Sequence, residues 1–116
     1  MGLSTHVLDT MHGCAAAGMA VALYATHGDN ATLLQRLVLN HDGRPDAPLL
    51  DNASLQVGTY RLRFDVAGYF RARGVVLPEP NFLDQVNLDF GVAHADQHYH
   101  VPLLVSPWSY STYRGS

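Results

Sequence analysis

Alternation of hydrophobic and polar residues is the dominant pattern of this chain. In residues 59–66 the two sets interleave, with Tyr60, Leu62, Phe64 and Val66 between Arg61, Arg63 and Asp65. A period of two places one set on each face of an extended strand. We therefore expect a strand here with one face on a core and the other toward water.

The same alternation recurs along the rest of the chain. It predicts strands at residues 3–9, 19–24, 33–39, 86–92 and 98–105, and a final strand within residues 110–116. In the third of these strands we expect a common core face for Leu33, Leu37 and Leu39. Turn-forming residues separate the strands at 27–30 and at 40–43, where the Asp-Gly pair favours a tight hairpin.

The segments between the strands are short. Residues 10–17 are predicted as a loop, 45–52 as a loop with a short edge strand, and 80–85 as a surface loop. Residues 67–73 are predicted as a short helix with Tyr69 and Phe70 packed inward. Seven or eight short strands at regular spacing predict an all-β sandwich, and 116 residues predict one domain spanning 1–116.

Composition narrows the class of function. The formal net charge is −3 and no basic block is present, so nucleic-acid and anionic-membrane binding lack an electrostatic basis. All seven basic residues are arginine, which excludes Schiff-base and other lysine chemistry. The charged fraction of 15% is below the usual quarter and leaves room for a buried subunit interface.

Cysteine usage and the N-terminal residues bear on location. The single Cys14 cannot form an internal disulfide, which is compatible with a reducing cytosol. The sequence has no membrane-spanning run and no basic segment of the kind that begins a signal peptide. We therefore expect a cytoplasmic protein.

Two of the seven histidines, His98 and His100, share one face of a predicted strand. Val101, Leu103 and Val105 occupy the opposite face. In extended geometry the two imidazoles lie roughly 6.5–7 Å apart and point the same way. A solvated sheet face explains such a pair as well as a functional site does, so the spacing by itself does not decide between them.

Four blocks of sequence, taken together, resemble the 5-hydroxyisourate hydrolase family, the transthyretin-like enzymes of urate breakdown. They are Leu3-Ser4-Thr5-His6-Val7-Leu8-Asp9, Asp42-Gly43-Arg44, His98-Tyr99-His100-Val101-Pro102-Leu103-Leu104 and the final Tyr113-Arg114-Gly115-Ser116. The last block is the family's signature and separates these enzymes from transthyretin, the hormone carrier of the same fold. One turn departs from the family pattern, because Gly13-Cys14-Ala15-Ala16 lacks its usual proline.

The resemblance implies a transthyretin-like sandwich of two four-stranded sheets with one short helix. It implies hydrolysis of 5-hydroxyisourate to 2-oxo-4-hydroxy-4-carboxy-5-ureidoimidazoline, a step of purine catabolism in which water attacks a cyclic amide. The implied catalytic residues are His6, Arg44, His100 and Ser116. The implied substrate-binding residues are His6, Arg44, His98, Tyr113 and Arg114. No cofactor is implied, and the implied assembly is a homotetramer with sites where dimers meet.

Residue chemistry leaves alternatives open. Three imidazoles from His6, His98 and His100 suit general-base activation of water, but they also suit Zn²⁺ with an open fourth position. The resemblance favours metal-free catalysis with adventitious zinc. A transthyretin-like carrier of small hydrophobic ligands is the rival from another class, and a zinc-dependent structural protein is a third. Such a carrier would desolvate these imidazoles and Arg44 at a cost, which favours the enzyme.

Overall fold

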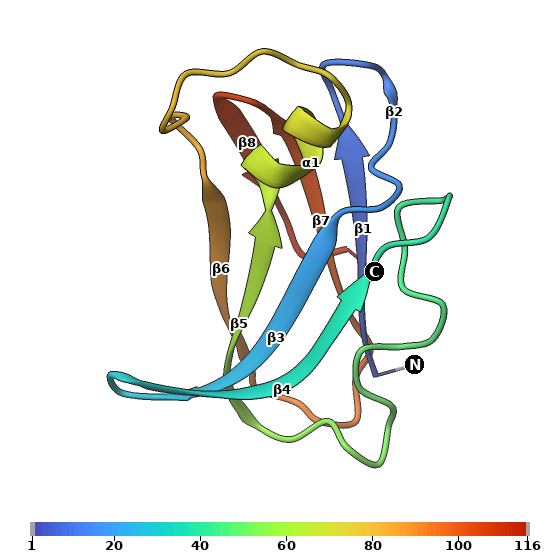
Figure 1. Ribbon diagram of the computed structural model, residues 1–116. Helices are drawn as coiled ribbons and strands as arrows, with labels where there is room; N and C mark the ends of the chain where they lie inside the picture. Colours follow the sequence, from blue (N-terminus) through green and yellow to red (C-terminus); the bar gives the residue numbers. More distant parts are fainter. Residues whose placement is uncertain (1, 116) are drawn as a thin grey trace.

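The computed structural model describes residues 2–115 and consists mainly of β-strands (Figure 1). In chain order the strands are β1 Leu3–Asp9, β2 Cys14–Ala15, β3 Ala20–His27, β4 Asn30–Val38, β5 Gly58–Asp65, β6 Gln85–Val92, β7 Tyr99–Ser106 and β8 Ser109–Thr112. Helix α1 spans Val66–Ala72. Within the described residues, no helix is long and apolar enough to cross a membrane.

The strands form two four-stranded sheets. One sheet has the order β2-β1-β7-β8 and the other the order β4-β3-β5-β6. Strands β1 and β7 run parallel, from Leu3 opposite Tyr99 to Asp9 opposite Val105, and the remaining strand pairs are antiparallel. The predicted sandwich of two four-stranded sheets with one short helix is therefore confirmed.

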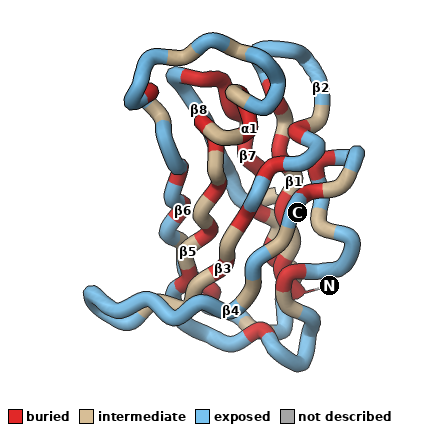
Figure 2. The backbone as a smooth tube through the Cα atoms, viewed as in Figure 1, coloured by how far each residue is buried: buried red, intermediate tan, exposed pale blue. Residues whose placement is uncertain are grey.

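The core lies between the two sheets, and alternate residues of the inner strands enter it (Figure 2). Along β1 every second residue from Leu3 onward is buried, and the residues between are only partly covered. In β5 the buried set is Tyr60, Leu62 and Phe64, as the alternation predicts. Each fully buried Leu or Phe side chain stabilises the fold by about 1.5–3 kcal/mol, so this pattern decides which face of each strand turns outward.

Helix α1 covers one end of the sandwich (Figure 1), and the buried carboxylate of Asp9 ties it to β1. It begins after Asp65, whose side chain accepts a hydrogen bond from the N–H of Gly68. On its buried face the hydroxyl of Tyr69 donates to the carboxylate of Asp9 at 2.8 Å. Asp9 also accepts the backbone N–H of His12 and lies 2.6 Å from its Nδ1.

Strand β4 differs from the prediction in its length and in the sheet face toward which its side chains point. It begins at Asn30, and a register shift opposite Leu23 and Tyr24 interrupts its pairing with β3. Beyond the shift Leu33 is 42% exposed, whereas Leu37 packs against the core. The predicted common face is therefore wrong at Leu33, because a β-bulge adds one residue and reverses the alternation.

Of the two predicted turns, only one closes a β-hairpin. Residues 27–30 join β3 to β4, as predicted. Residues 40–43 do form a turn, in which the N–H of Gly43 donates to the carbonyl oxygen of Asn40 at 2.9 Å. No described strand pairs with β4 beyond that turn, so the hairpin prediction is wrong there. The chain instead leaves the sheet after β4 and docks against β1.

Two predicted loops carry more order than expected. Residues 10–17 include β2, which pairs with the end of β1. In residues 80–85 the side chain of Asn81 is buried and donates to the carbonyl oxygen of Pro107 at 2.7 Å. This segment is therefore anchored to the turn between β7 and β8. The short edge strand predicted within residues 45–52 is present as a single bridge between Leu50 and Leu3.

Candidate active site

The outer face of β1 and β7 carries the histidines of two sequence blocks. Ser4 and His6 are outward residues of β1, only partly buried. His98 and His100 point to the same side, opposite to the buried Tyr99. Parallel pairing sets Ser4 in register with His100, so segments from the two ends of the chain meet on one surface.

Ser4 lies between the two imidazoles of this face. Its Oγ is 2.8 Å from Nδ1 of His100 and 3.4 Å from Nε2 of His98. The two rings are nearly parallel, with centroids 6.4 Å apart and an interplanar angle of 14°. The spacing predicted from an extended strand is confirmed, and the hydroxyl between the rings links them into one polar group.

Arg44 reaches this face because the Asp-Gly turn docks on β1. The carbonyl oxygen of Gly43 accepts the N–H of Val7 at 2.9 Å. Gly43 has a φ of 71°, and a Cβ there would lie 2.5 Å from the carbonyl oxygen of Val7, so only glycine allows this approach. The side chain of Asn40 accepts the N–H of Arg44 at 3.2 Å. Arg44 is thereby held next to His6.

A small pocket opens between this turn and the strands. Its volume is about 220 Å³, and Arg44, Ser4 and His98 are among the residues that line it. A guanidinium, a hydroxyl and an imidazole therefore converge on one space. Such a set suits a small, planar ligand with several oxygen atoms, because the guanidinium fork and the hydroxyl both donate hydrogen bonds.

Burial and the charge of Arg44 both favour neutral imidazoles. Burial, followed by the repulsion from Arg44, lowers the pKa of His6 below its usual 6.5, although a hydrogen bond with the backbone of Asp42 opposes the shift. Burial, Arg44, His6 and His98 together lower the pKa of His100. Both rings are therefore neutral near pH 7, as a general base must be.

Gly115 brings the end of the described chain onto the same face. Beyond β8, the N–H of Gly115 donates to the carbonyl oxygen of His100 at 2.8 Å, forming an isolated bridge. The final strand predicted within residues 110–116 is thus confirmed only as β8 and this bridge. Ser116, predicted to be catalytic, lies outside the described residues.

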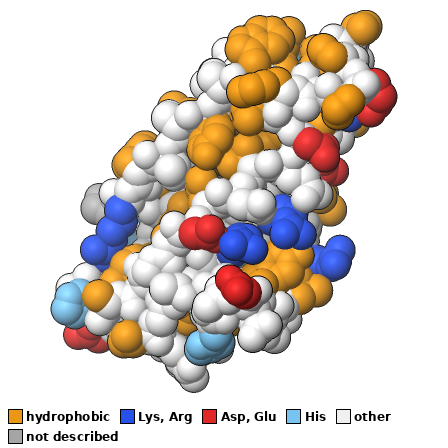
Figure 3. All heavy atoms as spheres, turned by 90° about the vertical axis from the view of Figure 1, so that its left-hand side faces the viewer, with side chains coloured by type: hydrophobic (Ala, Val, Ile, Leu, Met, Phe, Trp, Pro, Cys, Tyr) orange, Lys and Arg blue, Asp and Glu red, His pale blue; other side chains and the backbone are white. Residues whose placement is uncertain are grey.

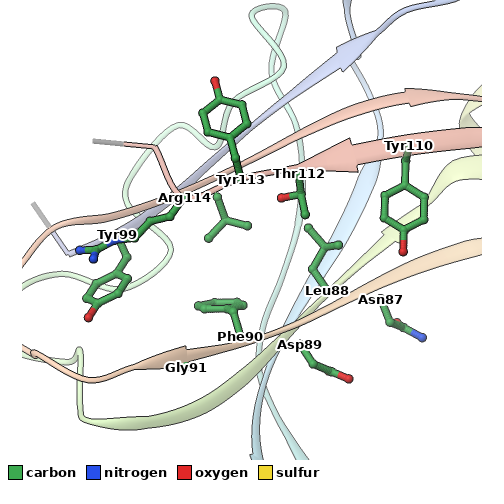
Figure 4. A pocket seen from close by; sticks show the side chains of 11 residues that line it. Asn87, Leu88, Asp89, Phe90, Gly91, Tyr99, Tyr110, Thr112, Tyr113 and Arg114 are labelled. Atoms are coloured by element: carbon green, nitrogen blue, oxygen red, sulfur yellow. The ribbon is translucent and has the colours of Figure 1, made fainter.

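Tyr113 and Arg114 diverge from one another. The guanidinium carbon of Arg114 lies 4.0 Å from the ring centroid of Tyr99, and its Nη2 donates to the side chain of Gln97 and the carbonyl oxygen of His98. Figure 4 shows Arg114 over Tyr99 and the ring of Tyr113 pointing away from them. Within one chain, the guanidinium of Arg114 therefore contacts Tyr99, Gln97 and the backbone of His98 rather than the imidazole rings of His98 and His100.

The cleft beside Arg114 is larger than the pocket at Arg44. It has a volume of about 450 Å³ and opens between the sheets, where residues of β6 and β8 line it. Its lining is mainly apolar and aromatic and includes none of the seven histidines. Its chemistry therefore suits packing rather than water activation.

His6, His98 and His100, the candidate ligands of adventitious zinc, are not grouped as a ready metal site in the described part of the chain. Within residues 2–115, no group of three His, Cys, Asp or Glu side chains converges closely enough to hold an ion.

Sequence reasoning did not identify Ser4 and Gly115 as parts of the site. Ser4 shares its strand face with His6 by simple alternation, so its proximity to the site was available from the pattern. Its contact with His100 depends on the parallel register of β1 and β7, which no local pattern specifies. The contact of Gly115 with His100 depends in the same way on the long-range bridge.

A statistical model of the HIUase/Transthyretin family matches residues 3–115. The chain belongs to this family. A 5-hydroxyisourate hydrolase of Pseudomonas aeruginosa is 56% identical over 114 residues, which cover 98% of this chain and 90% of that protein. The four motif blocks lie within the matched range, except for Ser116.

Solved structures agree with the family assignment. A 5-hydroxyisourate hydrolase of Klebsiella pneumoniae superposes with a TM-score of 0.81 and 32% identity, covering 99% of this chain and 98% of that one. An (S)-allantoin synthase superposes with a TM-score of 0.92 and 44% identity over 99% of this chain. The chain spans only 43% of that synthase.

Proposed function

We propose that this protein hydrolyses 5-hydroxyisourate to 2-oxo-4-hydroxy-4-carboxy-5-ureidoimidazoline in urate breakdown. The observation that carries the proposal is the convergence of β1, the Asp-Gly-Arg turn and β7 on one sheet face. That convergence places the imidazole of His98, a hydroxyl and a guanidinium around one small pocket, with the neutral imidazoles of His6 and His100 on the same sheet face. The 56% identity to a 5-hydroxyisourate hydrolase names the substrate that this chemistry would serve.

Roles for the individual side chains follow from their chemistry. Water activation is assigned to His6 together with His100, with His98 as a further candidate, since a neutral imidazole accepts a proton from the attacking water. Arg44 orients the substrate oxygens and stabilises negative charge that develops on the carbonyl. Hydroxide adds to the ring carbonyl carbon, the C–N bond breaks, and the ring nitrogen receives the proton. The hydroxyl group of the water is then on the carbonyl carbon, and its remaining proton is on the ring nitrogen.

The residues of the C-terminal block complete the proposed site. Tyr113 holds the substrate ring from the outer face, and Arg114 supports the binding residues through the carbonyl oxygen of His98. Ser116 completes the polar network with its hydroxyl group. No cofactor takes part in the proposed reaction, and Zn²⁺ at His6, His98 and His100 would be adventitious.

A homotetramer with sites where dimers meet is proposed as the working assembly. Edge strands β6 and β8 lie on the same side of the sandwich (Figure 1). Their residues line the apolar cleft between the sheets. Seen from that side, hydrophobic side chains run along the surface next to a group of arginine and acidic side chains (Figure 3). Paired edges would bury this surface. Sedimentation equilibrium tests the assembly, and a fully active monomer would contradict it.

Chain organisation and location complete the proposal. Residues 1–116 are taken to act as a single transthyretin-like hydrolase domain. Cytoplasmic location is supported by the lone Cys14, which is exposed and carries no disulfide. Cell fractionation followed by immunoblotting of each fraction tests the compartment.

An ultraviolet time course with freshly generated 5-hydroxyisourate tests the activity. We expect accelerated decay by the wild type, decay that survives treatment with a chelator, and loss of acceleration in His100→Ala. Arg36→Gln is the control, since Arg36 is an exposed arginine on the other sheet. Decay no faster than in buffer, from protein shown to be folded by circular dichroism, would refute the hydrolase.

The rival function is transport of small hydrophobic ligands by the same fold. It predicts saturable binding of an apolar aromatic probe at the outer face of β1 and β7, with no acceleration of 5-hydroxyisourate decay. The partly buried imidazoles and Arg44 oppose it, because an apolar ligand would leave their polar atoms without partners. Calorimetric titration with such a probe measures the difference directly.

A further inference from the structure

Within residues 2–115, Ser4 is the one hydroxyl that contacts both His98, just before β7, and His100 within β7. The short contact to Nδ1 of His100 and the longer one to Nε2 of His98 use one oxygen atom. A serine hydroxyl has a single proton to donate, and it can accept hydrogen bonds from others. If Ser4 donates to one imidazole, the other must donate to Ser4. The proton positions on the two rings are therefore coupled.

The far nitrogen of His98 decides the direction of this coupling. Nδ1 of His98 is buried and has no hydrogen-bond partner within residues 2–115. Buried N–H groups without an acceptor are rarer in proteins than acceptors left without a donor. The tautomer with a proton on Nδ1 is therefore disfavoured, and neutral His98 carries its proton on Nε2, facing Ser4.

The remaining proton positions follow in sequence. His98 donates from Nε2 to Oγ of Ser4, and Ser4 donates its own proton to Nδ1 of His100. Neutral His100 then carries its proton on Nε2. The missing side chain at Gly115 leaves room on that edge of the ring, because a Cβ there would approach Cδ2 of His100 to 2.7 Å. The N–H of His100 is thus available to a ligand on the outer face.

We propose that Ser4 is a positioning residue that fixes His100 as a hydrogen-bond donor through its Nε2–H, which narrows the general base of the proposed hydrolysis from the pair of His6 and His100 to His6 alone. The catalytic consequence rests on the proposed hydrolysis, whereas the proton positions do not. His6 takes a proton from water, the hydroxide adds to the ring carbonyl, and the C=O electron pair moves onto oxygen. His100 and Arg44 donate hydrogen bonds to that oxyanion. His6 then returns the proton to the departing ring nitrogen, so His100 keeps its own.

This division of roles fits the electrostatics of the site. The charged and titratable groups facing His6 are Arg44 and Asp42 from the turn and His100 from β7. With Arg44 close by, a second cation at His100 would be costly. A neutral donor stabilises an oxyanion without that cost.

Selective ¹⁵N labelling of histidine tests the proton positions by NMR without any substrate. Seven histidines are present, so the His98→Gln and His100→Gln spectra assign the relevant signals. At neutral pH we expect the Nε2–H tautomer at both His98 and His100. In Ser4→Ala we expect His100 to sample both tautomers, and in Ser4→Thr we expect the wild-type pattern. An Nδ1–H tautomer at His100 in the wild type would overturn the proposal.

Kinetics tests the catalytic consequence. Ser4→Ala should lower kcat/KM by about 10-fold to 100-fold, the range seen when partners that orient an imidazole are removed. Ser4→Thr should retain most of the activity because its hydroxyl can take the same place. Thr32→Ala is the control, since Thr32 is an exposed strand residue of the other sheet. Equal losses in the Thr and Ala variants, with both folded, would argue for packing alone and overturn the assignment.

Glutamine substitutions separate donor from base. An amide can donate a hydrogen bond but cannot act as a base, so His100→Gln should retain more activity than His100→Ala. His6→Gln should be as inactive as His6→Ala. The acid limb of the pH profile should persist in His100→Gln, and its disappearance would refute His6 as the base. An inactive wild type with the expected tautomers would instead reject the proposed hydrolysis while keeping the Ser4 coupling.

Discussion

The backbone N–H of Gly115 donates to the carbonyl oxygen of His100 at 2.8 Å, and a residue larger than glycine at that position would have to displace the His100 ring. A Cβ on Gly115 would lie 2.7 Å from Cδ2 of His100 and 3.3 Å from its Cβ. The φ of Gly115 is not positive, so the constraint comes from close approach to the imidazole and not from backbone strain. The glycine of the terminal block therefore has a structural reason to be there.

Gly115→Ala should impair the site while leaving the fold intact. The added methyl group would displace the ring of His100, and a displacement of about 1 Å can cost about 100-fold in rate. We expect kcat/KM to fall by that order, with little change in the urea midpoint, because Gly115 lies beyond the last strand. Steady-state kinetics and urea denaturation measure the two effects.

Gly91→Ala is the matched control for that substitution. Gly91 also lacks a positive φ, and a Cβ there would meet no atom within 4 Å. It should leave the rate unchanged. Equal activity in Gly115→Ala and Gly91→Ala would show that the imidazole tolerates displacement and would remove the significance of the contact.

Activity should fall at acid pH, with a midpoint below the usual histidine value of 6.5. The base must be neutral, and its pKa is lowered by burial and by Arg44, so the active form persists as pH falls through 6.5. Protonation at still lower pH removes the base. A profile of kcat/KM from about pH 5 to 8 records this fall in activity on the acid side, which is the acid limb. A flat profile over that range would contradict histidine catalysis.

Arg44→Gln should lower the rate and also move the acid limb. Loss of one donor to an oxyanion costs about 100-fold to 1,000-fold in kcat. Removing the positive charge also ends its repulsion of protonated His6 and His100, so both pKa values rise and activity is lost at a higher pH. The comparison uses full pH profiles for Arg44→Gln and Arg36→Gln. A limb at the wild-type position in Arg44→Gln would show that Arg44 lies too far away to act.

Tyr69→Phe should destabilise the fold with no direct effect on the site. The buried carboxylate of Asp9 would lose one hydrogen bond, which costs about 1–3 kcal/mol. Thermal and urea unfolding measure the loss. Tyr110→Phe is the control, because Tyr110 is 45% exposed and its hydroxyl has no hydrogen bond within the described residues. Equal stability of the two variants would contradict a structural role for the Asp9 contact.

The same substitution should change acid stability in a defined direction. Burial alone would raise the pKa of Asp9, but hydrogen bonds from His12 and Tyr69 outweigh it and lower the pKa below its usual 3.8. Stability from this group is therefore present above pH 3.8 and is lost as pH falls through the lowered value. Without the Tyr69 hydroxyl the pKa of Asp9 rises, so acid unfolding of Tyr69→Phe should begin at a higher pH than in the wild type.

Local pattern was a reliable guide wherever one strand face enters the core. The alternation in β5 identified Tyr60, Leu62 and Phe64 as buried, and the helix after it was placed within one residue at each end. Burial of these side chains dominates the energetics, so sequence period and structure must agree. The pattern was insufficient at β4, where the bulge turned Leu33 outward, because a bulge depends on pairing with the neighbouring strand.

In the candidate site, too, local sequence identified some features and long-range packing decided others. Motif blocks within the sequence pointed to His6, Arg44, His98 and His100, and alternation placed His98 and His100 on one face of an extended segment. The docking of the Asp-Gly turn on β1 was not foreseen, because the turn was expected to close a hairpin. The carbonyl oxygen of Gly43 in this turn accepts the N–H of Val7, which is distant in sequence. The turn reaches Val7 only because the chain leaves β4 and crosses to the other sheet.

By itself the sequence determined the sandwich, the strand faces and the residue types of the site, since these depend on side-chain period and on the chemistry of each group. Only the tertiary structure decided which groups touch. The parallel register of β1 and β7 sets Ser4 against His100, and the isolated bridge sets Gly115 against the same ring. Long-range register is settled by cooperative packing of whole sheets, and no short stretch of sequence contains that information.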